Sequence, residues 1–148
     1  MVSNIIGQGR QDEVKTLLWK IVQFSTGIAV TICLLMNIFP VFFMRIFSQD
    51  HDLLINAIPV MRVVSCAVVM MSFSSVCLNA VTGTGNTKVN LQIEIVAVIF
   101  YTIYVFTVLE VLHLSITWGW ASEWIYWASI FSLSFWYLRS GKWRNKKI

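Results

Sequence analysis

Charged residues are scarce in this chain. Of its 148 residues, 12% are Asp, Glu, Lys or Arg, whereas 57% are hydrophobic, and only two prolines are present. The three cysteines, Cys33, Cys66 and Cys77, are odd in number, lie within apolar segments, and lack the CxxC or Cys/His spacing that a zinc site needs. We therefore interpret them as small packing residues and predict no bound metal or other cofactor.

The sequence also lacks a recognisable catalytic constellation. Its two histidines, His51 and His113, have no nucleophile or acidic partner at a spacing typical of a triad or of general acid and base catalysis. The segments Gly7-Gln-Gly9 and Gly83-Thr-Gly85 neither follow a predicted strand nor continue into GK[ST], so they are predicted to be turns and not phosphate-binding loops. We expect no enzymatic activity.

Long apolar stretches dominate the chain instead. No charge interrupts residues 21–44 or 63–87, and each stretch is long enough, at about 1.5 Å per helical residue, to cross roughly 30 Å of hydrocarbon. Two further stretches carry carboxylates only near their ends. The pattern predicts an all-α membrane protein, a bundle of four antiparallel transmembrane helices without a separate soluble domain. Its predicted parts are a cytoplasmic loop at 1–16, spans at 17–47, 58–81, 91–114 and 116–138, and a basic cytoplasmic tail at 139–148.

The cations predict the orientation of these helices, because cytoplasmic loops retain Lys and Arg. The connections near residues 48–56 and 115–119 contain neither, although Arg45 and Arg62 lie close to the first. We therefore predict a multi-pass protein of the inner (plasma) membrane with both termini cytoplasmic. The cations of the predicted cytoplasmic segments are Arg10, Lys15, Lys20, Lys88, Arg139, Lys142, Arg144, Lys146 and Lys147.

The basic tail has two interpretations. Such a run can bind nucleic acid, but one that directly follows a span more simply fixes topology and contacts anionic lipid. We therefore expect the lipid bilayer as a partner and no nucleic acid. Aromatic residues at the two ends of the last span are predicted to form interfacial belts, namely Trp118, Trp120, Trp124 and Trp127 outside and Trp136, Tyr137 and Trp143 inside.

The two prolines are expected to mark changes in helix geometry. Pro40 lies inside the first span, where the loss of a backbone hydrogen bond predicts a kink, with Asn37 as a nearby partner for freed backbone groups. Pro59 stands where the second span begins, so it is predicted to start that helix.

Polar residues within the spans are the candidates for an ion or substrate path. Ser65, Ser72 and Asn79 recur every seven residues on one face of the second span, where they either line an aqueous cavity or allow close helix packing. Tyr101 and Tyr104 share a face of the third span, with the same two interpretations. From these sets, Ser72, Asn79 and Tyr101 are the candidates for the path.

Carboxylates are the stronger candidates, because an ionisable group in hydrocarbon is costly and marks a functional path by default. Glu94 and Glu110 lie sixteen residues apart, about 24 Å along a helix, and point to nearly opposite faces. Glu94 is the better candidate, although snorkelling or pairing with Lys88 also explains it. Glu123 has a structural explanation, because a carboxylate near the start of a helix interacts favourably with the helix dipole.

Three motifs resemble the multidrug and toxic compound extrusion (MATE) transporters. They are Ser3-Asn-Ile-Ile-Gly-Gln-Gly-Arg10 with Asp12-Glu13, Asn79-Ala-Val-Thr-Gly-Thr-Gly-Asn-Thr87, and Trp120-Ala-Ser-Glu-Trp-Ile-Tyr-Trp127 with Tyr137-Leu-Arg-Ser-Gly-Lys-Trp143. The resemblance places the four spans at helices nine to twelve of twelve, within one six-helix lobe, and the family's cytoplasmic loops match the orientation predicted from the cations. Some family members carry an acidic residue in helix ten, where this chain has apolar residues at 67–71.

The resemblance implies an antiporter that exports cationic or amphipathic compounds, including drugs, in exchange for protons or sodium. It also implies that the chain is the C-terminal portion of a transporter, is inactive alone, and has the missing N-terminal helices as partners. Two alternatives come from other classes. One is a four-helix scaffold or accessory module without transport activity. The other is a complete small transporter that works as a dimer. Such a transporter needs a membrane-central carboxylate in its first helix, and the first span of this sequence contains none.

Overall fold

The computed structural model describes residues 2–8, 13–46, 50–141 and 143. Every regular element in this part of the chain is helical, and no strand occurs in it, which confirms the predicted all-α class. In chain order the elements are α1 (Val2–Gly7), α2 (Glu13–Ile38), α3 (Pro40–Arg45), α4 (His51–Gly83), α5 (Thr87–Phe106), the π-helical turn η1 (Thr107–Val111), α6 (Ile116–Trp120) and α7 (Ser122–Ser140).

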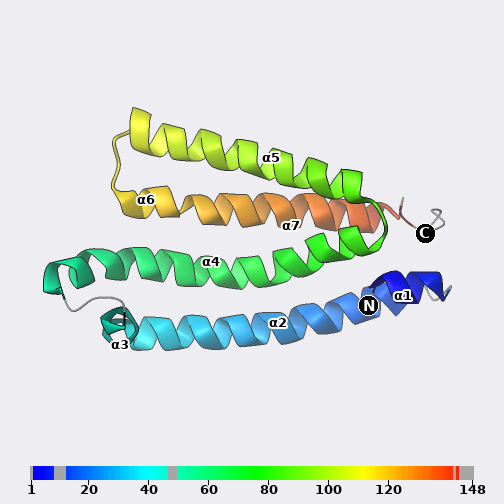
Figure 1. Cartoon of the computed structure of the whole chain (residues 1–148), viewed down its shortest axis with the longest axis horizontal. Coiled ribbons are helices and arrows are strands. Elements are labelled where there is room, and N and C mark those ends of the chain that lie inside the picture. Colours follow the sequence, from blue (N-terminus) through cyan, green and yellow to red (C-terminus); the bar gives the residue numbers. More distant parts are fainter. Residues whose placement is uncertain (1, 9–12, 47–49, 142, 144–148) are drawn as a thin grey trace.

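The long helices lie side by side in a row (Figure 1). Across the row the order is α2, α4, α7 and α5, so the last helix of the chain lies between α4 and α5. α4 packs along both α2 and α7, and α7 also packs along α5. Because α2 and α5 stand at opposite edges, the arrangement is an open row and not the bundle expected from the sequence.

The first predicted span is divided at Phe39. α2 ends at Ile38, and Pro40 begins α3, where the missing N–H of proline costs little because the first turn of a helix leaves its donors unpaired anyway. Phe39 has φ −118° and ψ 53°, outside the helical region, and Figure 1 shows the change of direction that follows. Proline therefore separates two helices here, where the sequence predicted a kink within one.

α4 begins well before the proline that was predicted to start it. The helix starts at His51, directly after Asp50, whose carboxylate accepts a hydrogen bond from the N–H of Asp52 at 3.1 Å. Pro59 lies inside the helix, so its prediction as a helix start is wrong. The physical reason is that Asp50 supplies a cap, whereas an internal proline in an apolar helix removes a single backbone hydrogen bond.

Within the residues that the structure describes, three helical segments are long and apolar enough to cross a membrane: Glu13–Ile38, Asp52–Gly83 and Thr87–Val111. α7 has 19 residues, but its tryptophan, tyrosine and serine residues lower its hydropathy. Between α4 and α5 the chain turns at Thr84 and Gly85, and Gly85 has φ +74°, a conformation that glycine adopts without a steric penalty. The predicted turn is confirmed at Thr84 and Gly85, whereas Gly83 is the last residue of α4.

The best-packed region lies at the end of the row that carries α1 and the last turn of α7. Two residues predicted for the inner aromatic belt are buried there, since Tyr137 is 9% and Trp143 2% exposed. Both side chains are buried, and not in an interfacial belt, because their polar groups have hydrogen-bond partners inside the protein. The amide of Asn86 donates to the hydroxyl of Tyr137 at 2.7 Å, and the indole N–H of Trp143 donates to the carbonyl of Leu138 at 3.0 Å.

Candidate functional site

Glu94 lies in a short chain of polar side chains that joins α4 to α5. The amide N–H of Asn90 donates to the carboxylate of Glu94 at 3.0 Å, and the carbonyl oxygen of Asn90 accepts from the hydroxyl of Thr82 at 3.0 Å. Glu94 is half-buried and stands about 10 Å along α5 from its first residue, Thr87. Its carboxylate therefore has a hydrogen-bond partner, and no cation bonds to it in the described part of the chain.

Aromatic side chains connect Glu94 with a second carboxylate on α7. The ring of Tyr101 packs edge-on against Tyr126, with the centroids 6.2 Å apart, and Tyr126 packs against Trp127 at 5.0 Å. The indole N–H of Trp127 donates to the carboxylate of Glu123 at 3.1 Å. Tyr126 lies within electrostatic reach of both Glu94 and Glu123. We call these five residues the carboxylate–tyrosine cluster.

The other two predicted site residues, Ser72 and Asn79, lie elsewhere. The hydroxyl of Ser72 donates to the carbonyl of Val69 at 2.7 Å and lies 3.5 Å from the hydroxyl of Thr26 on α2. Asn79 is exposed. The structure therefore brings Glu94 and Tyr101 to the interface of α5 with α7, and Ser72 to the interface of α2 with α4.

Ser65, the first residue of the predicted polar stripe, is a packing residue. It is 2% exposed and accepts a hydrogen bond from the amide of Asn37 at 2.9 Å. The same amide donates to the carbonyl of Cys33 at 2.8 Å, one turn earlier in α2. Cys33 and Cys66 meet beside this contact, with their sulfur atoms 3.7 Å apart. Asn37 thus joins α2 to α4, and is not bonded to a carbonyl freed by Pro40 as the sequence suggested.

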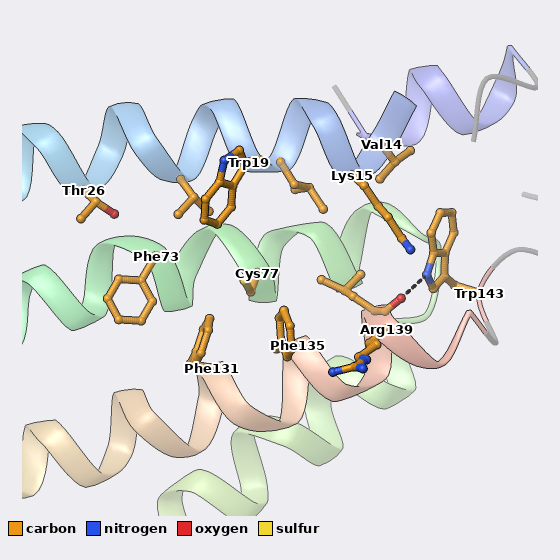
Figure 2. A pocket seen from close by; sticks show the side chains of 13 residues that line it. Val14, Lys15, Trp19, Thr26, Phe73, Cys77, Phe131, Phe135, Arg139 and Trp143 are labelled. Carbon is orange, nitrogen blue, oxygen red and sulfur yellow. Dashed lines mark hydrogen bonds between the residues drawn. The ribbon is translucent and has the colours of Figure 1, made fainter. Parts of the chain in front are cut away.

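A hollow that sequence reasoning missed lies between α2 and α7, with α4 as its floor (Figure 2). Its volume is about 630 Å³ and its walls are almost wholly apolar. We call it the α2/α7 groove. It is lined by α2 between Val14 and Thr26, by Phe73 and Cys77 of α4, and by α7 between Phe131 and Arg139, with Trp143 at one end.

The side chains at these sites can bind ligands and exchange protons or cations. Among the described residues, no group of three or more His, Cys, Asp or Glu side chains is placed to hold a metal ion. The carboxylate–tyrosine cluster offers carboxylate and phenol groups, which take up and release protons or coordinate a hard cation. Of the two carboxylates in the cluster, Glu123 was the weaker candidate from the sequence, because its position at the start of a helix already explains a carboxylate.

A family model described as MatE matches residues 1–108, a range that runs from α1 through α5 into η1. The motif around Trp120 and the basic tail lie beyond the matched range. Neither the curated proteins nor the solved structures contain a match to this chain.

Proposed function

The chain belongs to the MatE family of multidrug and toxic compound extrusion transporters, and from this premise we propose that it supplies helices nine to twelve of an antiporter. Family members are transporters that export small molecules, so the chain is a multi-pass membrane protein with a lipid bilayer and small-molecule substrates as partners. In our proposal, cationic or amphipathic drugs leave the cell in exchange for protons or sodium. The match over residues 1–108 carries this proposal.

We further propose that α2, α4, α5 and α7 all cross the inner (plasma) membrane, antiparallel and with both termini in the cytoplasm. The distribution of Lys and Arg along the chain supports this orientation. The packing of α7 between α4 and α5 supports a fourth span, because a helix with apolar spans on both sides shares their surroundings. Cysteine labelling at positions 51 and 145, in a cysteine-free background, should proceed from opposite sides of the membrane. Labelling of both positions from the same side contradicts the orientation.

The chain is proposed to act together with the other helices of the transporter and to be inactive alone. The open row supports this, since large apolar side chains such as Trp19 and Phe24 on α2 and Phe106 at the end of α5 are more than 60% exposed. Within a lobe of six helices, such faces pack against further helices or against lipid. Efflux of a fluorescent cationic dye from cells that express this chain alone should equal that of cells with an empty vector. Efflux above that level contradicts the dependence on other helices.

Glu94 is the proposed coupling group of this chain, with Tyr101 beside it in the carboxylate–tyrosine cluster, and Ser72 and Asn79 remain proposed path residues on α4. Among the described residues, its half-buried carboxylate bonds to a neutral amide and to no cation, so protonation or sodium binding changes its charge without breaking an ion pair there. Glu110 provides a matched control, because it lies in η1 at the end of the same helical segment and is exposed.

The test is dye efflux by the chain joined to the first eight helices of a MatE transporter. Glu94→Gln keeps the shape of the side chain and removes its charge, so it should lower efflux severalfold and flatten the dependence of efflux on external pH or sodium. Glu110→Gln should leave both unchanged. Unchanged efflux and unchanged ion dependence in Glu94→Gln would make Glu94 a structural residue.

A further inference from the structure

The α2/α7 groove is a partly open apolar hollow between two helices. Its walls come from Leu18, Trp19 and Val22 of α2 and from Phe131 and Phe135 of α7, with Phe73 on its floor. Its volume of about 630 Å³ falls within the range of about 300–1,000 Å³ that is usual for pockets that bind small molecules. No Asp or Glu lines it among the residues that the structure describes. The groove therefore suits an apolar ligand.

One end of the groove is basic. Lys15 of α2 and Arg139 of α7 line this end, and Figure 2 shows the amino group of Lys15 extending from α2 toward Trp143. Both cationic side chains are exposed, and the structure of the described residues shows no ion pair for either. Arg139 also suits the dipole of α7, since it stands in the last turn of that helix. Two unpaired cations from different helices at one mouth favour a ligand with an anionic head.

The length of the groove matches one leaflet of a bilayer. From Lys15 to Thr26 the helix rises through eleven residues, about 16 Å, and half of a hydrocarbon core of roughly 30 Å is about 15 Å. The apolar groove begins at residues predicted to lie at the membrane edge and ends near the middle, where Thr26 and Ser72 meet. A lipid tail has this length and direction.

We infer that the α2/α7 groove binds one acyl chain of an anionic phospholipid, whose phosphate contacts Lys15 and Arg139. Basic pockets between transmembrane helices on the cytoplasmic side bind anionic headgroups, and the aromatic walls supply the contacts for the tail. The inference rests on insertion of the helices in a membrane and does not require drug exchange. Binding here ties α2 to α7, the two walls that flank α4.

Photolabelling in nanodiscs tests the inference with the full chain. Two probes are used, phosphatidylglycerol and phosphatidylcholine, each carrying the same photoactivatable acyl chain, and labelled residues are mapped by mass spectrometry. We expect phosphatidylglycerol to label residues 14–26 and 131–143 about tenfold or more above phosphatidylcholine, since two cations each contribute to headgroup affinity. Lys15→Gln with Arg139→Gln should reduce this ratio to about one. Lys20→Gln, on the same helix but at a residue that does not line the groove, should preserve it.

A filling variant separates the tail site from the headgroup site. Val22→Trp should lower labelling of the groove by both lipids, because the larger side chain occupies the space of the acyl chain. Equal labelling by the two lipids in the unmodified chain would overturn the inference in favour of ordinary bilayer lipid. Labelling that misses the groove, while other helix faces react, would overturn it in favour of coverage by another helix. Both of these contradicting outcomes are measured on the unmodified chain, so misfolding of a variant does not affect them.

Discussion

The hydrogen bond between Asn37 and Ser65 should contribute measurably to the packing of α2 on α4. The amide nitrogen and the hydroxyl oxygen lie 2.9 Å apart, and Ser65 is 2% exposed. Each residue also has a bond within its own helix, from Asn37 to the carbonyl of Cys33 and from Ser65 to the carbonyl of Arg62. Single substitutions therefore remove two interactions, and only a double-mutant cycle isolates the contact between the helices.

The magnitude follows from the surroundings of the pair. Hydrogen bonds between membrane helices average about 0.6 kcal/mol and reach about 1.7 kcal/mol, because the unfolded chain also finds partners in the membrane. Ser65 is almost fully buried, so little solvent replaces the amide when Asn37 is truncated. We therefore expect a coupling free energy of about 1 kcal/mol between Asn37→Ala and Ser65→Ala.

The measurement is unfolding of the purified chain in mixed micelles, followed by circular dichroism as the fraction of dodecyl sulfate increases. Ser132→Ala is the control, because Ser132 is exposed and donates to the carbonyl of Ala128 in its own helix. This variant should change the free energy of unfolding by less than about 0.5 kcal/mol. A coupling free energy indistinguishable from zero, with all four proteins folded, would refute the reasoning that this contact holds the two helices together.

Two other predictions concern helix contacts. Mild oxidation should join Cys33 to Cys66 in a disulfide, because their sulfur atoms lie 3.7 Å apart, and should leave Cys77 reduced. Mass spectrometry of the digested protein identifies the disulfide. A disulfide that contains Cys77 contradicts the packing of α2 on α4. Gly119→Leu should destabilise the chain by about 1–3 kcal/mol, because even the Cβ would lie 3.3 Å from a methyl group of Leu109 and the rest of the larger side chain would overpack this buried contact. A melting temperature unchanged by this substitution contradicts the close approach of α6 to η1.

Much of the fold was predictable because a long apolar stretch can adopt few backbone structures in a membrane. An uncharged run of more than twenty residues must satisfy its backbone internally, and helices do so within one segment. The positions of α2, α4 and α5 follow from this rule. Helix ends were less predictable, since Asp50 caps α4 eight residues before the point suggested by proline. A local cap outweighed the positional preference of Pro59.

The candidate site was only partly predictable, because tertiary packing decides which helices lie next to each other in the row. The sequence identified Glu94 from the cost of a carboxylate in hydrocarbon, and periodicity placed Tyr101 two turns further along the helix. The approach of Tyr126 and Glu123 depends on α7 lying beside α5, which helical periodicity does not specify. The α2/α7 groove depends on three separate segments, and its basic end combines residues more than 120 positions apart.

The long helices bury little of their apolar surface against one another. In the apolar stretches of α2, α4 and the segment 87–111, only 6%, 22% and 17% of residues are buried within the chain. Burial of apolar side chains between helices is therefore a minor source of stability, and the bilayer must cover most of this surface. Specific contacts then decide which helices pair. Asn37 with Ser65 joins α2 to α4, and Ser74, whose hydroxyl lies 3.0 Å from the carbonyl of Trp127, joins α4 to α7. Polar groups at these interfaces order the row, and the apolar faces outside them remain available to lipid and, in the function proposed above, to further helices.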